Sequence, residues 1–355
     1  MDGLPLWLLA VIFVAAAVVV WVAGVQLSRT TDVLDARLGI GSALGGLVVL
    51  AIATNLPEIA ITVSAAISGN ISVAVGNILG GIALQTVVLV ILDVFGRRAP
   101  GARPLTYRAA SLVLVVEAVM VVAILTVVMA GTQLPADALF GRLTADVVLI
   151  AVLWVAALVL VRRASVALPW QATGAAPTST PGPRRRRRRP EPPHASMSTA
   201  KAWLVFTIAA LATLGAGVAL ERSGDAAADV LGMSGLLFGA TFLALATSLP
   251  EISTGLQAVK QGDDDLAVSD IFGGNAFLPV LFLVATLITG RAVLPDAGAA
   301  DIYLTALGAL LTLVYVVGLI FRPTRRVLGM GVDSLVVLVL YVIGIVGLFA
   351  IAGSG

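Results

Sequence analysis

Cysteine is absent from this chain of 355 residues, and the single histidine is His194. Without cysteine the chain can form neither disulfides nor thiolate metal sites, so oxygen atoms are the main ligands left for a cation. Charged residues make up 12% and aromatic residues 6%, whereas hydrophobic residues make up 59% and the mean hydropathy is +1.06. Polar surface is too scarce to cover a soluble globule of this length, so the composition predicts an integral membrane protein.

Ten apolar runs are long enough to cross a bilayer, which takes about 20 residues of helix. They cover residues 4–27, 38–67, 71–95, 108–131, 143–163, 201–221, 229–258, 266–290, 301–321 and 331–352. No basic segment precedes the first run, so it is expected to stay as a helix and not to be cleaved as a signal. The sequence predicts an all-α membrane protein with ten transmembrane helices.

The chain also contains an internal duplication. Residues 50–86 match residues 243–279 at 16 of 37 positions, at a constant offset of 193. Each copy carries the segment Ala-Thr-x-Leu-Pro-Glu, which ends at Glu58 in the first copy and at Glu251 in the second. A carboxylate at bilayer depth costs roughly 2.5–3.5 kcal/mol on insertion scales. Two such residues in equivalent places predict a functional site made by both halves.

The prolines of the two segments predict breaks in the second and the seventh helix. Pro57 and Pro250 have no N–H group and disfavour helix at the residue before them. The carbonyls of Ala53 and Ala246 are then expected to lack their usual donors. Free carbonyls beside a glutamate suit a hard cation, above all Ca²⁺, which takes about 6 to 8 oxygen ligands.

Lysine and arginine accumulate in the cytoplasmic loops of membrane proteins. With the N-terminus outside, 19 of the 22 basic residues fall in inside loops, and only Arg142, Arg222 and Arg291 fall outside. Five helices per repeat is an odd number, so the second repeat enters the membrane from the opposite face. We therefore expect two inverted-topology repeats, both termini outside, a cytoplasmic central loop and a location in the inner (plasma) membrane of a prokaryote.

The predicted regions are a first five-helix repeat at 1–163, a linker at 164–200 and a second repeat at 201–355. The linker holds six consecutive arginines, Arg184 to Arg189, among prolines, and cannot bury a core. We interpret it as a disordered segment whose charge fixes the topology, with a patch for anionic membrane lipid as the alternative. Nucleic-acid binding is disfavoured because no aromatic residues are interleaved. His194 is interpreted as a solvated linker residue.

The third and eighth helices carry a second duplicated pattern. It reads Gly-Asn-Ile-Leu-Gly-Gly at Gly76–Gly81 and Ser-Asp-Ile-Phe-Gly-Gly at Ser269–Gly274. Glycine in a membrane helix lets a neighbouring backbone approach closely. Both repeats place the pattern at the same distance from their glutamate, which ties it to the predicted site.

Together these motifs resemble those of the calcium/cation antiporter superfamily, the sodium-calcium exchangers and their prokaryotic relatives, over the whole membrane part. The resemblance implies that Glu58 and Glu251 bind Ca²⁺ together. It implies backbone carbonyl ligands and polar side chains of the Na⁺ sites as well. The carbonyls are those of Ala51, Thr54, Ala244 and Thr247, and the side chains are those of Asn55 and Ser248.

Some positions depart from the pattern of that family. Its serine positions are Gly81 and Gly274 here, and its last polar positions are Gln85 and Leu278. Several side-chain ligands for Na⁺ are therefore missing, although Gln85 still offers an amide oxygen. The set of Ca²⁺ ligands is complete, whereas the coupling ion can be Na⁺ or H⁺.

Three more polar residues are predicted inside the membrane part. Asp270 stands where the family has asparagine, and its counterpart in the first repeat is Asn77. Both are accessory candidates near the cation cavity, with a water-reachable position near the helix end as the alternative for Asp270. For Glu117, in the fourth helix, a hydrogen bond inside the bundle is favoured over a role in a proton path.

The leading hypothesis is a secondary active antiporter, not an enzyme, that exchanges Ca²⁺ for Na⁺ or H⁺ by alternating access and needs no cofactor. Two ionised glutamates carry a charge of −2, which one Ca²⁺ or two monovalent cations neutralise. The alternatives are an exchanger for another cation and a non-transporting protein that binds calcium or lipid. A channel is disfavoured because two acids on broken helices do not form a pore ring.

Overall fold

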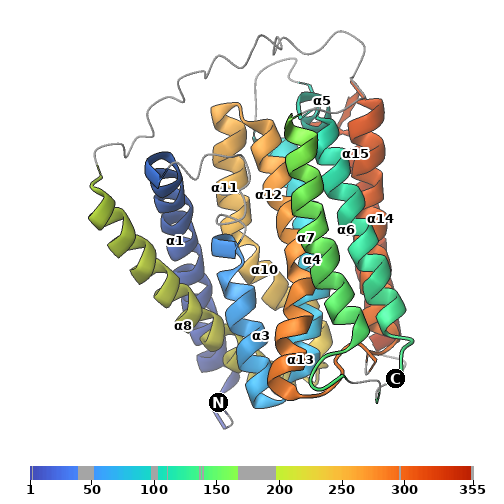
Figure 1. Cartoon of the computed structure of the whole chain (residues 1–355). Coiled ribbons are helices and arrows are strands. Elements are labelled where there is room, and N and C mark those ends of the chain that lie inside the picture. Colours follow the sequence, from blue (N-terminus) through green and yellow to red (C-terminus); the bar gives the residue numbers. More distant parts are fainter. Residues whose placement is uncertain are drawn as a thin grey trace.

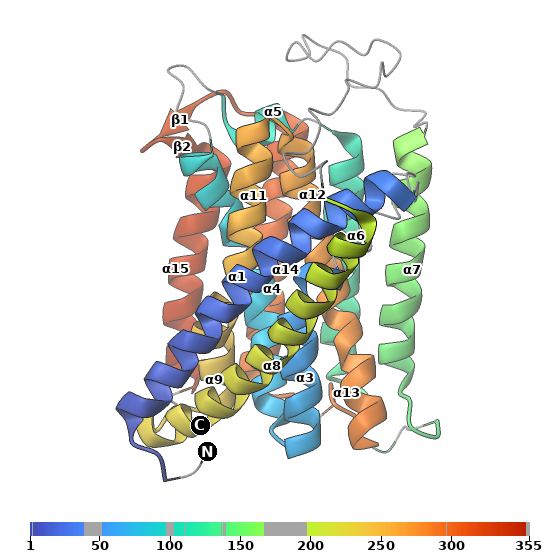
Figure 2. The same ribbon diagram turned by 90° about the vertical axis from the view of Figure 1, so that its left-hand side faces the viewer.

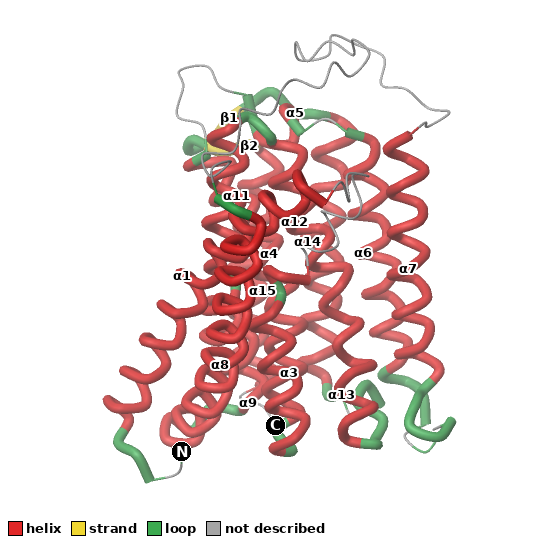
Figure 3. Tube along the Cα trace, turned by 60° about the vertical axis from the view of Figure 1, so that its left-hand side comes forward, coloured by secondary structure: helices red, strands yellow, loops and turns green. Residues whose placement is uncertain are grey.

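The computed structural model describes residues 1, 3–38, 52–96, 103–109, 111–135, 137, 140–166, 197–295 and 297–352. Over these ranges the chain is helical apart from loops and one short strand pair (Figures 1 and 3). The first repeat contributes α1 (Leu6–Leu38), α3 (Leu56–Ser68), α4 (Ile71–Phe95), α5 (Leu105–Arg108), α6 (Leu112–Gly131) and α7 (Ala145–Val166). The second contributes α8 (Thr199–Leu231), α9 (Gly235–Phe238), η1 (Gly239–Leu243), α10 (Ala244–Thr247), α11 (Leu249–Gln261), α12 (Asp264–Phe277), η2 (Leu278–Val280), α13 (Leu281–Thr289), α14 (Ala299–Phe321), β1 (Arg326–Val327), β2 (Met330–Gly331) and α15 (Val332–Ala352).

The membrane class is confirmed. Eight described helices are long and apolar enough to cross a bilayer, and a ninth span is the bent pair formed by Gly235–Thr247 and Leu249–Gln261. Of the predicted second span, the described part is a turn of helix at 52–54 followed by α3, because residues 39–51 lie outside the described ranges. The first span ends at Leu27 as predicted, although α1 continues to Leu38, so Arg29 lies in a helix and not in a loop. The sixth span was predicted too short, because α8 continues about three turns past the expected end, to Leu231.

The two repeats run in opposite directions. α1 leads away from the face that holds both termini, whereas α8 leads back toward it (Figure 1). The contacts between helices come in equivalent pairs, one from each repeat. α3 packs on α8 as α11 packs on α1, and α6 packs on α7 as α14 packs on α15. Likewise, α4 packs on α14 as α12 packs on α6. Equivalent helices of the two repeats thus make equivalent contacts, as inverted repeats require.

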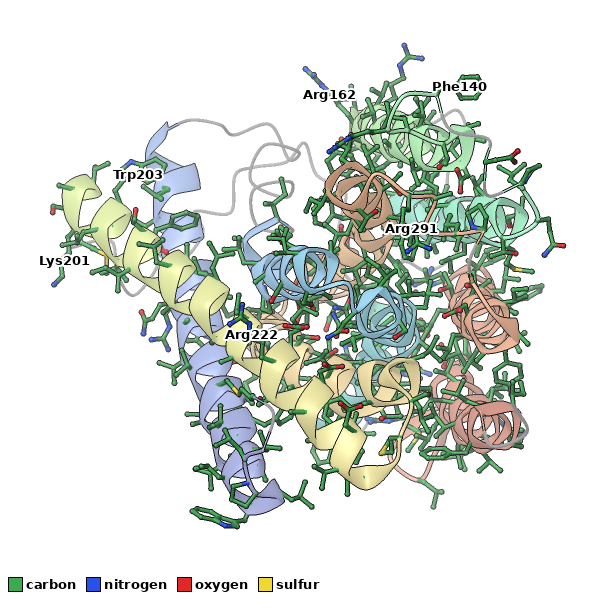
Figure 4. All side chains as sticks on the ribbon, turned by 90° about the horizontal axis from the view of Figure 1, so that it is seen from below. Phe140, Arg162, Lys201, Trp203, Arg222 and Arg291 are labelled. Atoms are coloured by element: carbon green, nitrogen blue, oxygen red, sulfur yellow. The ribbon has the colours of Figure 1, made fainter. Side chains whose placement is uncertain are left out.

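α1 and α8 form a layer of their own, side by side and oblique to the remaining helices (Figures 2 and 4). Each touches the proline break of the opposite repeat through a glycine. A Cβ on Gly24 would lie 2.7 Å from the Cβ of Pro250, and a Cβ on Gly217 would lie 3.0 Å from the carbonyl oxygen of Pro57. Gly24 and Gly217 are separated by the repeat offset of 193, so the same contact occurs at equivalent positions of both repeats.

α4 is the central helix and is buried along most of its length. Glycines bring its backbone against the first half of the broken span: a Cβ on Gly76 would collide with Leu236, and one on Gly80 with the backbone of Ala240. The apolar side chains left exposed lie mostly on the outer helices α1, α7, α8 and α15, where lipid replaces protein as the neighbour.

We expect Gly80→Ala to destabilise the protein by about 1–3 kcal/mol, the usual cost of overpacking, because the new methyl group has no space beside Ala240. Gly215→Ala is the matched control, since a Cβ there meets nothing within 4 Å. It should stabilise α8 by up to about 1 kcal/mol through helix propensity. Thermal unfolding of the purified protein in detergent measures both, and equal effects would contradict the contact.

Candidate cation site

The seventh span is broken where the sequence predicted it. α10 ends at Thr247, α11 begins at Leu249, and the two halves meet at an angle of 40°. In the first repeat α3 likewise begins at Leu56, directly after Asn55. Pro57 and Pro250 occupy the second position of their helices, where the missing N–H group costs no hydrogen bond.

Glu58 and Glu251 each lie in the first turn of the helix that follows the break. Their side chains are 0% and 2% exposed. Within the described part of the chain none of their four carboxylate oxygens has a hydrogen-bond partner. The N-terminal end of a helix favours negative charge, but it does not replace the direct ligands that a buried carboxylate needs.

The two carboxylates face each other's repeat. The side chain of Thr247 approaches the carboxylate of Glu58, and Glu251 lies within electrostatic range of both Glu58 and Asp270. Asp270 is nearly buried, and its Oδ2 accepts a hydrogen bond of 3.2 Å from the Thr254 hydroxyl. Three carboxylates therefore lie close together, and the structure places Asp270 beside the glutamate of its own repeat.

The carbonyl of Ala244, expected as a ligand, is surrounded by donors in this structure. It accepts hydrogen bonds from the Ser248 hydroxyl at 2.8 Å, the Ser248 N–H at 3.0 Å and the Thr247 hydroxyl at 3.2 Å. Both hydroxyls can rotate, so a cation at this carbonyl requires that they turn away and offer their own oxygens. Of the other expected carbonyl ligands, Thr54 is buried beside the break, and Ala51 lies outside the described residues.

Two polar side chains of the first repeat, those of Asn55 and Gln85, lie close to the backbone of Gly274 in the second repeat. A Cβ on Gly274 would lie 3.3 Å from Nδ2 of Asn55 and 3.5 Å from Oε1 of Gln85. A serine at this position would put its hydroxyl against both amides, whereas glycine lets the Asn55 side chain lie closer to the backbone of α12 than a Cβ would comfortably allow. The amide atoms of Gln85 and Asn77 are fully buried and, among the described residues, have no hydrogen-bond partner.

Sequence reasoning missed Asn275. It is fully buried, and its Nδ2 donates to the hydroxyl of Thr86 at 3.1 Å and to the carbonyl of Ile82 at 3.4 Å. Ile82 is its own counterpart in the first repeat, so this contact links the repeats at equivalent positions. The sequence signal that could have identified Asn275 is that it stands where the first repeat has an isoleucine, directly after the matched Gly-Gly pair.

Glu117 is bonded inside the bundle, in agreement with the structural interpretation. Its Oε1 accepts a hydrogen bond of 2.9 Å from the hydroxyl of Ser269, which precedes Asp270 on α12. His194 and the run from Arg184 to Arg189 lie outside the described residues.

The model of the family described as sodium/calcium exchanger protein matches residues 8–168 and 201–350. The chain belongs to the sodium/calcium exchanger family. This confirms the resemblance seen in the motifs and makes the chain a cation-transporter family protein and not an enzyme. The inner membrane protein YrbG of Escherichia coli strain K12 is 28% identical over 296 residues, which cover 82% of this chain and 83% of YrbG.

Other exchangers share the sequence in part or the fold. The putative antiporter CaxA of Alkalimonas amylolytica is 38% identical over 112 residues, which are 31% of this chain and only 33% of that protein. The crystal structure of the H⁺/Ca²⁺ exchanger CAX superposes with a TM-score of 0.64 at 11% identity, covering 98% of this chain and 88% of CAX. The sodium-calcium exchanger NCX_Mj gives a TM-score of 0.58 at 17% identity, covering 96% and 99%. These two similarities establish the fold.

We expect Glu251→Gln to be at least as stable as the unmodified protein in buffer without divalent cations, because the substitution removes one of several neighbouring buried charges. Ca²⁺ should stabilise the unmodified protein, by about 2.7 kcal/mol at 100 times its dissociation constant, and should stabilise the variant less. Thermal unfolding with and without Ca²⁺ measures both effects.

Glu221→Gln is the matched control for that experiment. Glu221 is also buried, but its oxygens accept hydrogen bonds from Ser64 at 2.8 Å and Ser68 at 3.3 Å. This variant should keep the full response to Ca²⁺. If Glu221→Gln lost the stabilisation by Ca²⁺ and Glu251→Gln kept it, Glu221 and not Glu251 would be the Ca²⁺ ligand.

Proposed function

We propose that this protein is a secondary active antiporter that exchanges Ca²⁺ for Na⁺ or H⁺ at a site between the two repeats. One observation carries the proposal: Glu58 and Glu251, from opposite repeats, are buried together with four carboxylate oxygens that have no partner among the described residues. Burying two charges without hydrogen bonds is unfavourable unless a cation supplies the missing interactions.

Charge balance then enforces exchange. One Ca²⁺ neutralises two carboxylates, and so do two protons or two Na⁺ ions, whereas the unliganded, fully ionised site is costly to move between the two faces of the membrane. The inverted repeats supply the two alternative openings, because whatever one repeat does at one face the other can do at the opposite face. Asp270 adds a third carboxylate and would serve as an accessory ligand for a further monovalent cation. Asn77 would have the same role in the first repeat.

The ligand set is proposed as in the exchanger family. Ca²⁺ would bind the carboxylates of Glu58 and Glu251 with the carbonyls of Ala51, Thr54, Ala244 and Thr247, while Asn55, Ser248 and Gln85 would serve the counter-ion. Oxygen atoms alone make up this set, which is what Ca²⁺ and Na⁺ prefer. The glycine at 274 removes one hydroxyl from the counter-ion region, which favours H⁺ more than in a relative with serine there.

The proposed orientation has both termini outside and the linker in the cytoplasm of a cell whose inner membrane holds the protein. In support, α5, the end of α11 and the β1–β2 pair lie at the face opposite the termini (Figure 2), and they carry Arg108, Lys260 and Arg326. Basic residues concentrate on the cytoplasmic face. The boundaries at 1–163, 164–200 and 201–355 stay predictions, as does lipid binding by the linker.

Ca²⁺ flux into proteoliposomes tests the proposal, with a Na⁺ gradient and a pH gradient imposed separately. We expect one of the two gradients to drive Ca²⁺ uptake, and we expect Glu58→Gln to reduce it at least 100-fold because the site loses half of its charge. Glu221→Gln, which changes a buried carboxylate outside the site, should transport normally. Uptake that survives both Glu58→Gln and Glu251→Gln would refute the assignment, and uptake of another divalent cation alone would replace Ca²⁺ as the substrate.

Single cysteines test the orientation, since the chain contains none of its own. Phe140, between α6 and α7, and Leu328, between the two strands, are 76% and 81% exposed and lie at opposite faces. In intact cells a membrane-impermeant maleimide should label Phe140→Cys, and it should label Leu328→Cys only after permeabilisation. The reverse pattern would place the linker outside.

A further inference from the structure

A second group of buried oxygen atoms lies at the end of α4 opposite the termini, outside the candidate site. Its carboxylates are those of Asp93, which is fully buried, and Asp333, which is 6% exposed. Asp93 is eight residues beyond Gln85 on α4, or about 12 Å at 1.5 Å per residue. Asp333 is the second residue of α15, so the pair joins two helices that are far apart in the sequence.

The carboxylate of Asp93 accepts hydrogen bonds from three donors. Its Oδ1 accepts a hydrogen bond of 2.7 Å from the N–H of Leu105. Its Oδ2 accepts bonds from the N–H of Gly331 at 2.6 Å and from the hydroxyl of Ser334 at 3.1 Å. Three donors on two oxygens stabilise the negative charge.

Within the described ranges, Asp333 makes no hydrogen bonds of this kind, although the Thr106 hydroxyl and the backbone N–H of Ser334 lie near its carboxylate. Neither of its oxygens has a hydrogen-bond partner among the residues that the structure describes. A Cβ on Gly331 would collide with the Asp333 carboxylate and would lie 3.2 Å from Oδ2 of Asp93, so the two carboxylates lie on either side of one glycine. Arg326 donates to the backbone carbonyl of Asp93 and not to its carboxylate. A second buried negative charge beside the first is left without a positive partner in the described chain.

Hydroxyl groups complete the cluster. The side chain of Thr106 faces Asp333, and the Tyr315 hydroxyl lies within electrostatic range of both carboxylates and 3.4 Å from the Ser334 hydroxyl. All three hydroxyl residues are at most 2% exposed. Two carboxylates and three hydroxyls from α4, α5, α14 and α15 therefore converge in a place that water scarcely reaches.

We propose that Asp93 and Asp333 hold a hard divalent cation, with the hydroxyls of Thr106, Tyr315 and Ser334 as neutral oxygen ligands. The two carboxylates match the charge of one such ion, and the all-oxygen set matches Ca²⁺ or Mg²⁺ over softer metals. The cation would tie the ends of α4 and α5 to the start of α15. This inference does not rest on transport, because none of its residues belongs to the site of Glu58 and Glu251.

The first repeat provides a natural control. Asp146 is the second residue of α7, as Asp333 is of α15, and a Cβ on Gly131 would lie 2.7 Å from its Oδ2. Gly318 meets Asp333 in the same way. The position on α13 that corresponds to Asp93 at the repeat offset is Thr286, so the symmetry-related cluster has one carboxylate, Asp146, where the Asp93–Asp333 cluster has two.

Equilibrium binding of radioactive Ca²⁺ to the purified Glu58→Gln/Glu251→Gln protein tests the proposal, because the candidate transport site is removed. We expect about one Ca²⁺ per chain, binding at least tenfold weaker after further Asp333→Asn substitution, and unchanged binding after Asp146→Asn. Absence of Ca²⁺ binding in the double variant, or equal binding with and without Asp333→Asn, would overturn the proposal and leave a proton shared between the two carboxylates.

Terbium luminescence provides a second measurement with a milder substitution. Tb³⁺ replaces Ca²⁺ at oxygen sites and emits when a nearby tyrosine is excited. In the same double variant, Tyr315→Phe keeps the packing of the ring and should reduce tyrosine-excited Tb³⁺ emission several-fold, and Ca²⁺ should displace the remaining ion. Emission that is unaffected both by Tyr315→Phe and by Asp333→Asn would contradict a site at this cluster.

Discussion

The burial of Glu58 and Glu251 is the constraint on which the rest of the structure depends. A carboxylate inside an apolar bundle needs donors, a counter-ion or a proton, and the described residues give these two no hydrogen-bond donors. This missing interaction is the one that the proposed cation would supply. Every feature around the site serves this arrangement: the breaks put helix ends where continuous helices would offer none, and the glutamates sit in the first turns that follow.

The breaks must be held from outside, because a helix interrupted in the membrane loses its own hydrogen bonds. Glycine residues allow the supporting helices to approach the breaks closely. Gly24 and Gly217 let α1 and α8 rest on the prolines of the opposite repeats, and Gly80 brings the backbone of α4 against Ala240. Each repeat thus packs against a helix of the other.

Symmetry of the scaffold coexists with asymmetry of the side chains. The helix contacts are exchanged almost one for one between the repeats, yet Asp270 faces Thr254 only in the second, and Asn275 stands opposite Ile82. The buried pair of Asp93 and Asp333 has a single-carboxylate counterpart at Asp146. Under the proposed function, the two repeats would supply two related openings, and the choice of ion would depend on side chains that differ between the repeats.

The sequence by itself determined the membrane class, the family, the broken seventh helix and the two glutamates, because hydropathy, proline chemistry and a repeated motif are local properties. It did not show that Asp270 lies within electrostatic range of Glu251 or that Gly274 faces Asn55 and Gln85. It also placed the end of the sixth span about three turns too early, since α8 continues to Leu231. The tertiary structure decided these contacts. Asp270 comes near Glu251 only because α12 packs against α11, and Gly274 meets Asn55 and Gln85, about 190 to 220 positions away, only when both repeats have folded together.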